Sequence, residues 1–178
     1  MSGQEHRIDG TQDERTGVNR SAPLKFTFDG RQYEGYRGDT LASALLANGV
    51  HLVGRSFKYH RPRGIMTAGS EEPNALIQLG VGNRTDPNLR ATQIEIYDGL
   101  VASSQNRWPC LTFDIGSMNN LLHRFLPSGF YYKTFMWPTS WWLKYEHWIR
   151  RAAGLGKAPA GRDPDRYEKM HRNTDVLI

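Results

Sequence analysis

The amino-acid sequence predicts an α+β fold in which one helix crosses a mixed β-sheet, followed by a helical extension rich in aromatic residues. Three features predict it. Apolar residues alternate on both sides of a tight turn, a helical run follows between a capping residue and a stop signal, and a later strand follows a loop rich in Gly and Pro. A chain of 178 residues suits one domain of ordinary size with a tail or a second small lobe.

The first element is a β-hairpin. Apolar and polar side chains alternate from residue 24 to residue 28, Asp29 and Gly30 supply a tight turn, and Tyr33 and Tyr36 follow on the return. One face of this hairpin is therefore expected to be buried.

A short helix follows the hairpin. Asp39 is placed to cap it, Leu41 and Leu45 lie on one apolar side with small alanines, and Asn48-Gly49 ends it. This helix is expected to pack on the hairpin.

The remaining strands come after a long loop. The loop from residue 54 to residue 80 is rich in charge, Gly and Pro and ends in an apolar strand at residues 75–79. A second hairpin is expected from Ile94 and Ile96, through Asp98-Gly99, to residues 100–102. The order hairpin, helix, long loop, strand, hairpin is that of a β-grasp domain.

The composition sets limits on compartment and cofactors. The single cysteine, Cys110, excludes an internal disulfide and an all-cysteine metal site built within this chain. No apolar run approaches the roughly 20 residues that span a bilayer, and the start of the chain lacks a signal peptide, so the cytoplasm is expected. Six histidines are scattered without ligand spacing and are expected at the surface or in packing.

The chain divides into four segments. Residues 1–22 are expected to form a flexible N-terminal arm, 23–115 the β-grasp domain, 116–156 a helical extension, and 157–178 a linker that ends in the opening of a buried parallel strand. An alternative is that the apolar end, residues 175–178, docks on this domain as an edge strand.

The extension carries most of the tryptophans. All five lie between Trp108 and Trp148, and a helix starting near Thr139 or Ser140 and stopping at Gly154 presents several aromatic side chains on one side. About half of these aromatics suit a core, and the rest predict an interface with another surface.

A basic loop is the main candidate for binding. Within residues 54–64, Arg55, Lys58, Arg61 and Arg63 stand among aromatic residues. They suit an anion or nucleic-acid site, because guanidinium groups bind phosphate bidentately and rings stack on bases. The alternative, a loop packed against a partner subunit, is favoured.

Two runs of sequence carry a resemblance to a known family. Residues 38–50, GDTLASALLANGV, and residues 55–64, RSFKYHRPRG, resemble the N-terminal ferredoxin-like module of sarcosine oxidase alpha subunits. Later stretches, residues 127–138, 149–156 and 164–169, also resemble that subunit. The resemblance covers roughly residues 19–178 and implies a ferredoxin-like β-grasp. It also implies that residues 157–178 are a linker and the first strand of a missing dinucleotide-binding domain.

In relatives with a two-iron cluster, the cysteines follow the plant-type spacing C-x4-C-x2-C plus a distant fourth. That spacing falls on Thr67, Glu72 and Ala75, with Cys110 at the fourth place. Because three thiolates are missing, the resemblance implies vestigial cluster positions and no cofactor, metal or catalytic residue in this segment. Cys110 is then expected to be a buried structural thiol.

The resemblance implies a structural and assembly role in a heterotetrameric complex that oxidatively demethylates sarcosine to glycine. The complete complex is expected to use FAD, FMN, NAD and tetrahydrofolate, and the partners would be the remainder of the alpha subunit and the beta, gamma and delta subunits. The alternatives are an electron-transfer module of an amino-acid dehydrogenase complex and a basic nucleic-acid-binding domain. Nucleic acid is the less favoured partner, and no membrane contact is expected.

Overall fold

The computed structural model describes residues 4–8, 17–125, 129, 137–152, 154–167 and 169–171. The strand expected at residues 175–178 and the aromatic residues 130–136 lie outside these described residues. No helix in the described part of the chain is long and apolar enough to cross a membrane.

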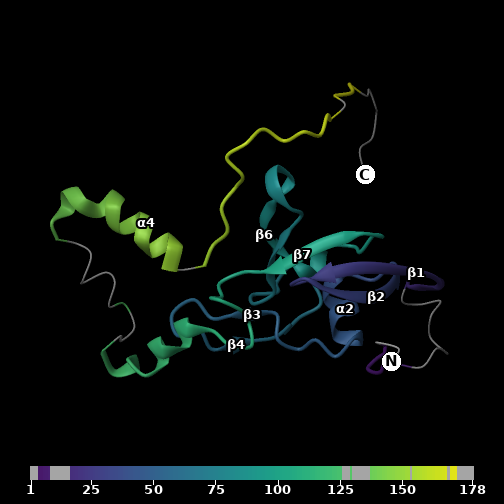
Figure 1. Cartoon of the computed structure of the whole chain (residues 1–178), viewed down its shortest axis with the longest axis horizontal. Coiled ribbons are helices and arrows are strands. Elements are labelled where there is room, and N and C mark those ends of the chain that lie inside the picture. Colours follow the sequence, from purple (N-terminus) through teal and green to yellow (C-terminus); the bar gives the residue numbers. More distant parts are fainter. Residues whose placement is uncertain are drawn as a thin grey trace.

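The described residues form a five-stranded mixed sheet in the order β2-β1-β7-β5-β6, which confirms the predicted β-grasp (Figure 1). The predicted hairpin is β1 (Asn19–Phe28) and β2 (Arg31–Arg37), antiparallel with Phe26 opposite Tyr33. The last strand, β7 (Leu100–Ser104), pairs parallel to β1 at the centre of the sheet. β1 begins upstream of residue 23, where the domain was expected to start.

The second predicted hairpin is wrong. β7 pairs antiparallel with β5 (Leu76–Leu79), and β5 pairs on its other side with β6 (Asp86–Arg90), which the sequence pattern did not single out. Residues 94–96 form no strand of this sheet; Ile96 is buried and Ile94 packs against the core. Their apolar side chains therefore serve packing rather than strand pairing.

Helix α2 (Leu41–Ala47) covers one face of the sheet. Its fully buried Leu41 and Leu45 join Phe26, Ile77 and Leu100 in the hydrophobic core. The helix ends at Asn48 and Gly49, as predicted, and Gly49 takes a φ of 71°. The apolar side of the helix and one face of the sheet thus share one core, which is the packing expected of an α+β domain.

The predicted cap of α2 is shifted by one residue. Thr40, not Asp39, is the N-cap, and its hydroxyl accepts a hydrogen bond from the backbone N–H of Ser43 at 3.1 Å. Asp39 is instead buried, and Arg7 donates two hydrogen bonds to it at 3.1 and 2.6 Å. This pairing ties the described residues of the N-terminal segment to the start of α2.

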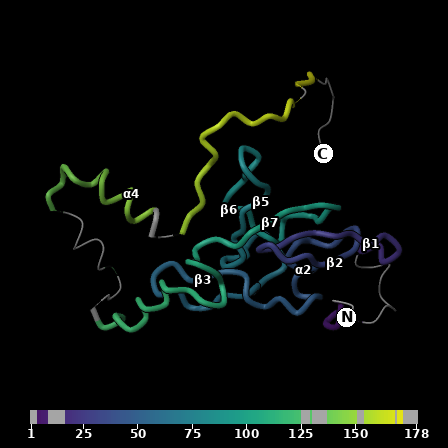
Figure 2. The backbone as a smooth tube through the Cα atoms, viewed as in Figure 1, coloured from purple at the N-terminus to yellow at the C-terminus, as the bar shows by residue number. Residues whose placement is uncertain are grey.

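Small elements complete the fold. The long loop contains a two-stranded ladder, β3 (Gly54–Arg55) with β4 (Pro62–Arg63), and 3-10 turns cover Gly82–Arg84 and Ala91–Gln93. Beyond β7 come the 3-10 helices Ile115–Asn120, His123–Phe125 and Thr139–Trp141, and then α4 (Trp142–Ala152). The tube in Figure 2 shows α4 standing apart from the sheet, whereas the extended chain after it returns past the sheet.

Candidate functional site

The loop between β4 and β5 is organised around one buried carboxylate. Glu72 is 0% exposed. Its Oε2 accepts hydrogen bonds from the backbone N–H groups of Met66 and Thr67, both at 2.7 Å, and its Oε1 accepts those of Asn74 at 2.7 Å and Ala75 at 3.3 Å. The two sides of the loop therefore meet on one side chain.

The same contacts control the protonation of Glu72. Burial by itself raises the pKa of this carboxyl, because the charged form loses its hydration. Hydrogen bonds from the backbone N–H groups of Thr67, Asn74, Met66 and Ala75 outweigh burial and bring the pKa below its ordinary value. Glu72 is therefore a carboxylate at neutral pH.

The loop is also fastened to the far edge of the sheet. Arg90 Nε donates to the carbonyl of Glu72 at 3.1 Å, and the Thr92 hydroxyl donates to the carbonyl of Gly69 at 2.7 Å. The backbone N–H of Ala91 donates to the carbonyl of Ala75 at 2.9 Å. The position of the loop thus depends on β6 and on the turn after it.

Three of the four residues expected at vestigial cluster positions come together here. Thr67 and Ala75 both donate backbone hydrogen bonds to Glu72. Cys110 lies in another environment: its sulfur is 3.3 Å from the Thr112 hydroxyl and 3.5 Å from the Phe113 carbonyl oxygen. Thr67, Glu72 and Ala75 therefore lie together in one loop, whereas Cys110 contacts Thr112 and Phe113 instead.

The expectation that Cys110 is buried is wrong, since its side chain is only partly covered. A hydrogen bond with the Thr112 hydroxyl, and then one with the backbone at Phe113, lower the pKa of the thiol below its ordinary value. The nearby positive charge of Arg107 also lowers the pKa of this thiol, by less than the two hydrogen bonds do.

The basic side chains of residues 54–64 differ in how far they are exposed to solvent. Arg55 is largely covered: its guanidinium donates to the carbonyl of Leu111 and, at 3.1 Å, to that of His60. Arg61 and Arg63 are exposed. The four basic residues predicted as one anion or subunit contact therefore differ in exposure, because the Arg55 guanidinium is bonded to the backbone of Leu111 and His60.

Lys58 and Arg61 share one aromatic ring. The Lys58 ammonium lies 4.9 Å and the Arg61 guanidinium 4.8 Å from the centre of the Tyr59 ring. Arg61 also donates to the side-chain oxygen of Asn120 at 3.0 Å. This cation–π arrangement keeps two positive charges on the outer side of the loop.

A cavity of about 320 Å³ lies between the basic loop and the Glu72 loop. Arg55 and Arg63 line it from one side, Asn74 from the second, and Leu155 from the segment after α4. Because the Asn74 backbone is held by Glu72, the buried carboxylate also fixes one wall of this cavity.

Of two buried acids that organise the domain, sequence reasoning gave Asp39 the wrong role and missed Asp114. Asp39 holds the start of α2, and Asp114 receives hydrogen bonds from the backbone N–H groups of Trp108 and Gly116 and lies 2.7 Å from His60 Nδ1. An acid next to a turn or between apolar residues is a weak signal, because most such acids are solvated. Among the described residues, no group of three or more His, Cys, Asp or Glu could hold a metal ion.

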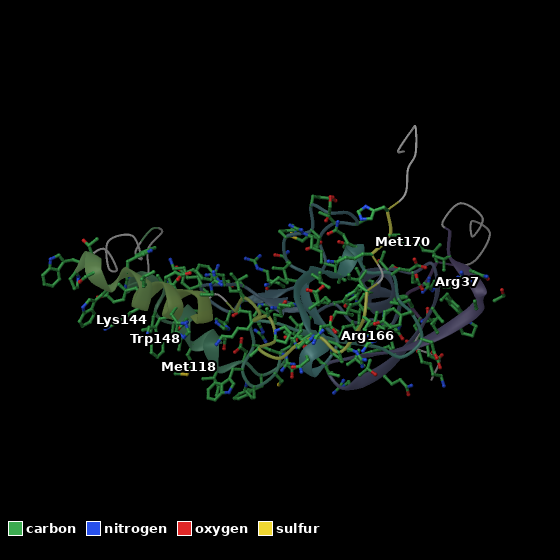
Figure 3. The ribbon with its side chains drawn as sticks, turned by 90° about the horizontal axis from the view of Figure 1, so that it is seen from above. Arg37, Met118, Lys144, Trp148, Arg166 and Met170 are labelled. Carbon is green, nitrogen blue, oxygen red and sulfur yellow. The ribbon has the colours of Figure 1, made fainter. Side chains whose placement is uncertain are left out.

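The extension exposes large apolar side chains. Trp137 is 83% exposed, Trp148 67% and Leu121 77%. Met118, Lys144 and Trp148 lie at the same end of the molecule, away from Arg37 on the sheet (Figure 3). This aromatic surface is the second candidate site, suited to another protein surface rather than to a small molecule.

Comparison with known proteins gives one consistent result. Residues 21–107 match the family of the 2Fe-2S iron-sulfur cluster binding domain. The chain is 65% identical over 162 residues to the sarcosine oxidase subunit alpha of Rhizobium meliloti (strain 1021), covering 90% of this chain and 16% of that protein. It is 46% identical over 175 residues to the subunit of the same name in Corynebacterium sp. (strain U-96). This match covers 97% of this chain and 13% of that protein. The chain therefore spans a small fraction of the length of these relatives.

A solved structure is also similar in part. The crystal structure of L-proline dehydrogenase from P. horikoshii is 29% identical, covers 48% of this chain and 16% of that chain, and superposes with a TM-score of 0.37. A TM-score this low supports no conclusion about the fold.

The family match overturns the expectation that this segment has no cofactor. The matching family is one that binds a two-iron cluster, so an iron–sulfur group is the cofactor to consider here. The side chains at the expected positions do not fit the four-thiolate ligand set of such a cluster. Thr67, Glu72 and Ala75 carry no sulfur, and both Glu72 oxygens are already occupied by backbone N–H groups.

Proposed function

Because the chain is a homologue of sarcosine oxidase alpha subunits and contains a ferredoxin-like β-grasp, we propose that it acts as a structural and assembly segment of such a subunit. In this proposal the oxidation of sarcosine occurs in other parts of the enzyme, with FAD, FMN, NAD and tetrahydrofolate bound there. The partners would be the remainder of the alpha subunit and the beta, gamma and delta subunits. The cytoplasm is the proposed compartment.

The exposed aromatic surface of the extension is the observation that supports this role. Trp141, Trp142 and Trp148 are 49%, 47% and 67% exposed on or next to one short helix. Large aromatic side chains left in water cost solvation free energy, and they are enriched where proteins meet. We therefore propose residues 116–156 as the segment that contacts the partner, next to a β-grasp domain whose first strand begins at Asn19.

The test compares two exposed aromatic residues in the full chain produced together with the other oxidase subunits. Trp148→Asp should reduce the amount of partner subunit recovered with the chain by about tenfold or more, as expected for an interface anchor. Tyr97→Asp is the control, because Tyr97 is 54% exposed on the β-grasp domain. Equal recovery with both variants would contradict an interface at the extension.

The family match raises a second function, electron transfer through an iron–sulfur group, although the matched residues 21–107 contain no cysteine to bind one. An iron and sulfide assay, with the visible spectrum of the full chain purified with its partners, distinguishes the two functions. A stoichiometric two-iron group that is reduced during turnover would support electron transfer. Flavin absorbance with partner subunits but without such a group would support assembly.

A further inference from the structure

The loop from Met66 to Ala75 has the geometry of an anion-binding nest. Four backbone N–H groups converge on one point, two from residues 66–67 and two from residues 74–75. Successive N–H groups that point into one concavity are a recurrent way to bind anions in proteins. Here each pair of N–H groups is matched to one carboxylate oxygen.

The chemistry of the nest selects an ionised carboxylate. All four backbone groups are donors, so the best occupant accepts hydrogen bonds at both ends and donates none. The Thr67 hydroxyl, 3.3 Å from Glu72 Oε2, lies on the same side. A carboxylate fits this demand, whereas an amide of the same shape would direct its NH2 group at two of the N–H groups.

Removing the anion from the nest would raise the free energy of the folded chain. Glu72 is fully buried, and a buried N–H group without an acceptor costs about 1–3 kcal/mol. In the described part of the chain, no other acceptor is recorded for the N–H groups of residues 66, 67, 74 and 75. The loop therefore depends on an anion at this point.

We propose that the loop from Met66 to Ala75 is a carboxylate-binding site whose resident ligand is the chain's own Glu72 side chain. A free carboxylate of similar size, such as formate or acetate, would then occupy the nest when this side chain is removed. Glu72 acts as a positioning residue: it holds the Asn74 backbone and with it one wall of the cavity beside Arg63. This inference does not depend on the proposed assembly role.

The test uses the full chain carrying Glu72→Ala, with hydrogen exchange of individual backbone amides measured by NMR. The amides of residues 66, 67, 74 and 75 should exchange about tenfold faster or more than in the wild-type chain, as loss of one hydrogen bond each implies. The amide of Ile77 in β5 should change less. Sodium formate, compared with sodium chloride at the same ionic strength, should restore slow exchange at the four amides of the variant.

The adjacent Glu71 provides a matched control. Glu71 is exposed, and in the part of the chain that the structure describes its carboxylate accepts one hydrogen bond, from the Gly69 N–H at 3.3 Å. Glu71→Ala should leave the four amides protected, and formate should have no specific effect on it. Unchanged protection in Glu72→Ala, or a formate effect of the same size in Glu71→Ala, would overturn the proposal.

A second variant covers the case in which Glu72→Ala does not fold. Glu72→Gln keeps the size of the side chain but replaces one acceptor oxygen with an NH2 group. It should lose protection at one pair of amides, either 66 and 67 or 74 and 75, and keep it at the other pair. Full protection of all four amides in this variant would show that the nest does not require a carboxylate.

Discussion

His60 Nδ1 lies 2.7 Å from Oδ2 of Asp114, and this contact joins the basic loop to the segment that follows β7. An ionised carboxylate only accepts hydrogen bonds, so Nδ1 carries the proton and donates it. The Asp114 side chain is fully buried and also lies 4.0 Å from Arg55 Nε. His60 is therefore held by a buried acid that sequence reasoning did not identify.

Replacement of Asp114 should destabilise the domain strongly. Asp114→Ala removes the acceptor of His60 and of two backbone N–H groups, and it removes the carboxylate 4.0 Å from Arg55 Nε. The expected loss of unfolding free energy is about 3 kcal/mol. The free energy of unfolding in urea measures it. Asp165→Ala is the control, because its ion pair with Arg84 is exposed and should contribute little. Equal stability of the two variants would contradict a structural role for the buried contact.

The contribution of the α2 N-cap to stability should be measurable by removing the Thr40 hydroxyl. Thr40→Ala removes the acceptor of the Ser43 N–H and should lower the free energy of unfolding by about 1 kcal/mol. Thr40→Ser keeps the hydroxyl and should stay close to the wild type in the same unfolding experiment. If both variants lose stability equally, the Thr40 methyl group rather than the cap is responsible.

Glu72 should make stability depend on pH in the acid range. The pKa of Glu72 is lowered in the folded chain, so its contribution is complete above the unfolded value of about 4.3. That contribution is lost as pH falls through the lower, folded pKa. Unfolding measured at a series of pH values should therefore show a steeper acid loss in the wild type than in Glu72→Gln. Parallel curves for the two chains would contradict the lowered pKa.

Cys110 should react with alkylating reagents at a lower pH than an ordinary thiol. Its hydrogen bond with the Thr112 hydroxyl contributes most to the lowered pKa, and the thiolate is the reactive form. The pH midpoint of iodoacetamide labelling measures the effect. Thr112→Val keeps a similar shape without the hydroxyl and should move the midpoint upward. A midpoint that is the same in both chains would show that Thr112 does not stabilise the thiolate.

Local patterns predicted the elements that neighbouring residues define. The β1–β2 hairpin follows from alternation around Asp29 and Gly30, and the bounds of α2 follow from Leu41 and Leu45 with the stop at Asn48-Gly49. Each of these signals lies within a few residues of the structure that it forms. The helix from Thr139 to the region of Gly154 was predictable for the same reason.

Strand pairing was less predictable. β6 contains Pro87 and Asn88, which weaken a strand signal, yet its backbone pairs with β5. The apolar Ile94 and Ile96 suggested a strand but lie in the core without one. The first part of the predicted helical extension holds two short 3-10 helices, Ile115–Asn120 and His123–Phe125, rather than one longer helix.

The sequence by itself determined the β1–β2 hairpin and the helix α2, because these depend on periodicity and turn residues close together in the chain. It also placed Thr67, Glu72 and Ala75 in one loop through their spacing. Only the tertiary structure decided that the Glu72 carboxylate turns inward onto four N–H groups, that Asp114 meets His60, and that Cys110 lies elsewhere. These contacts join residues whose positions depend on the packing of the whole domain, and a buried acid is stable only where packing brings donors to it.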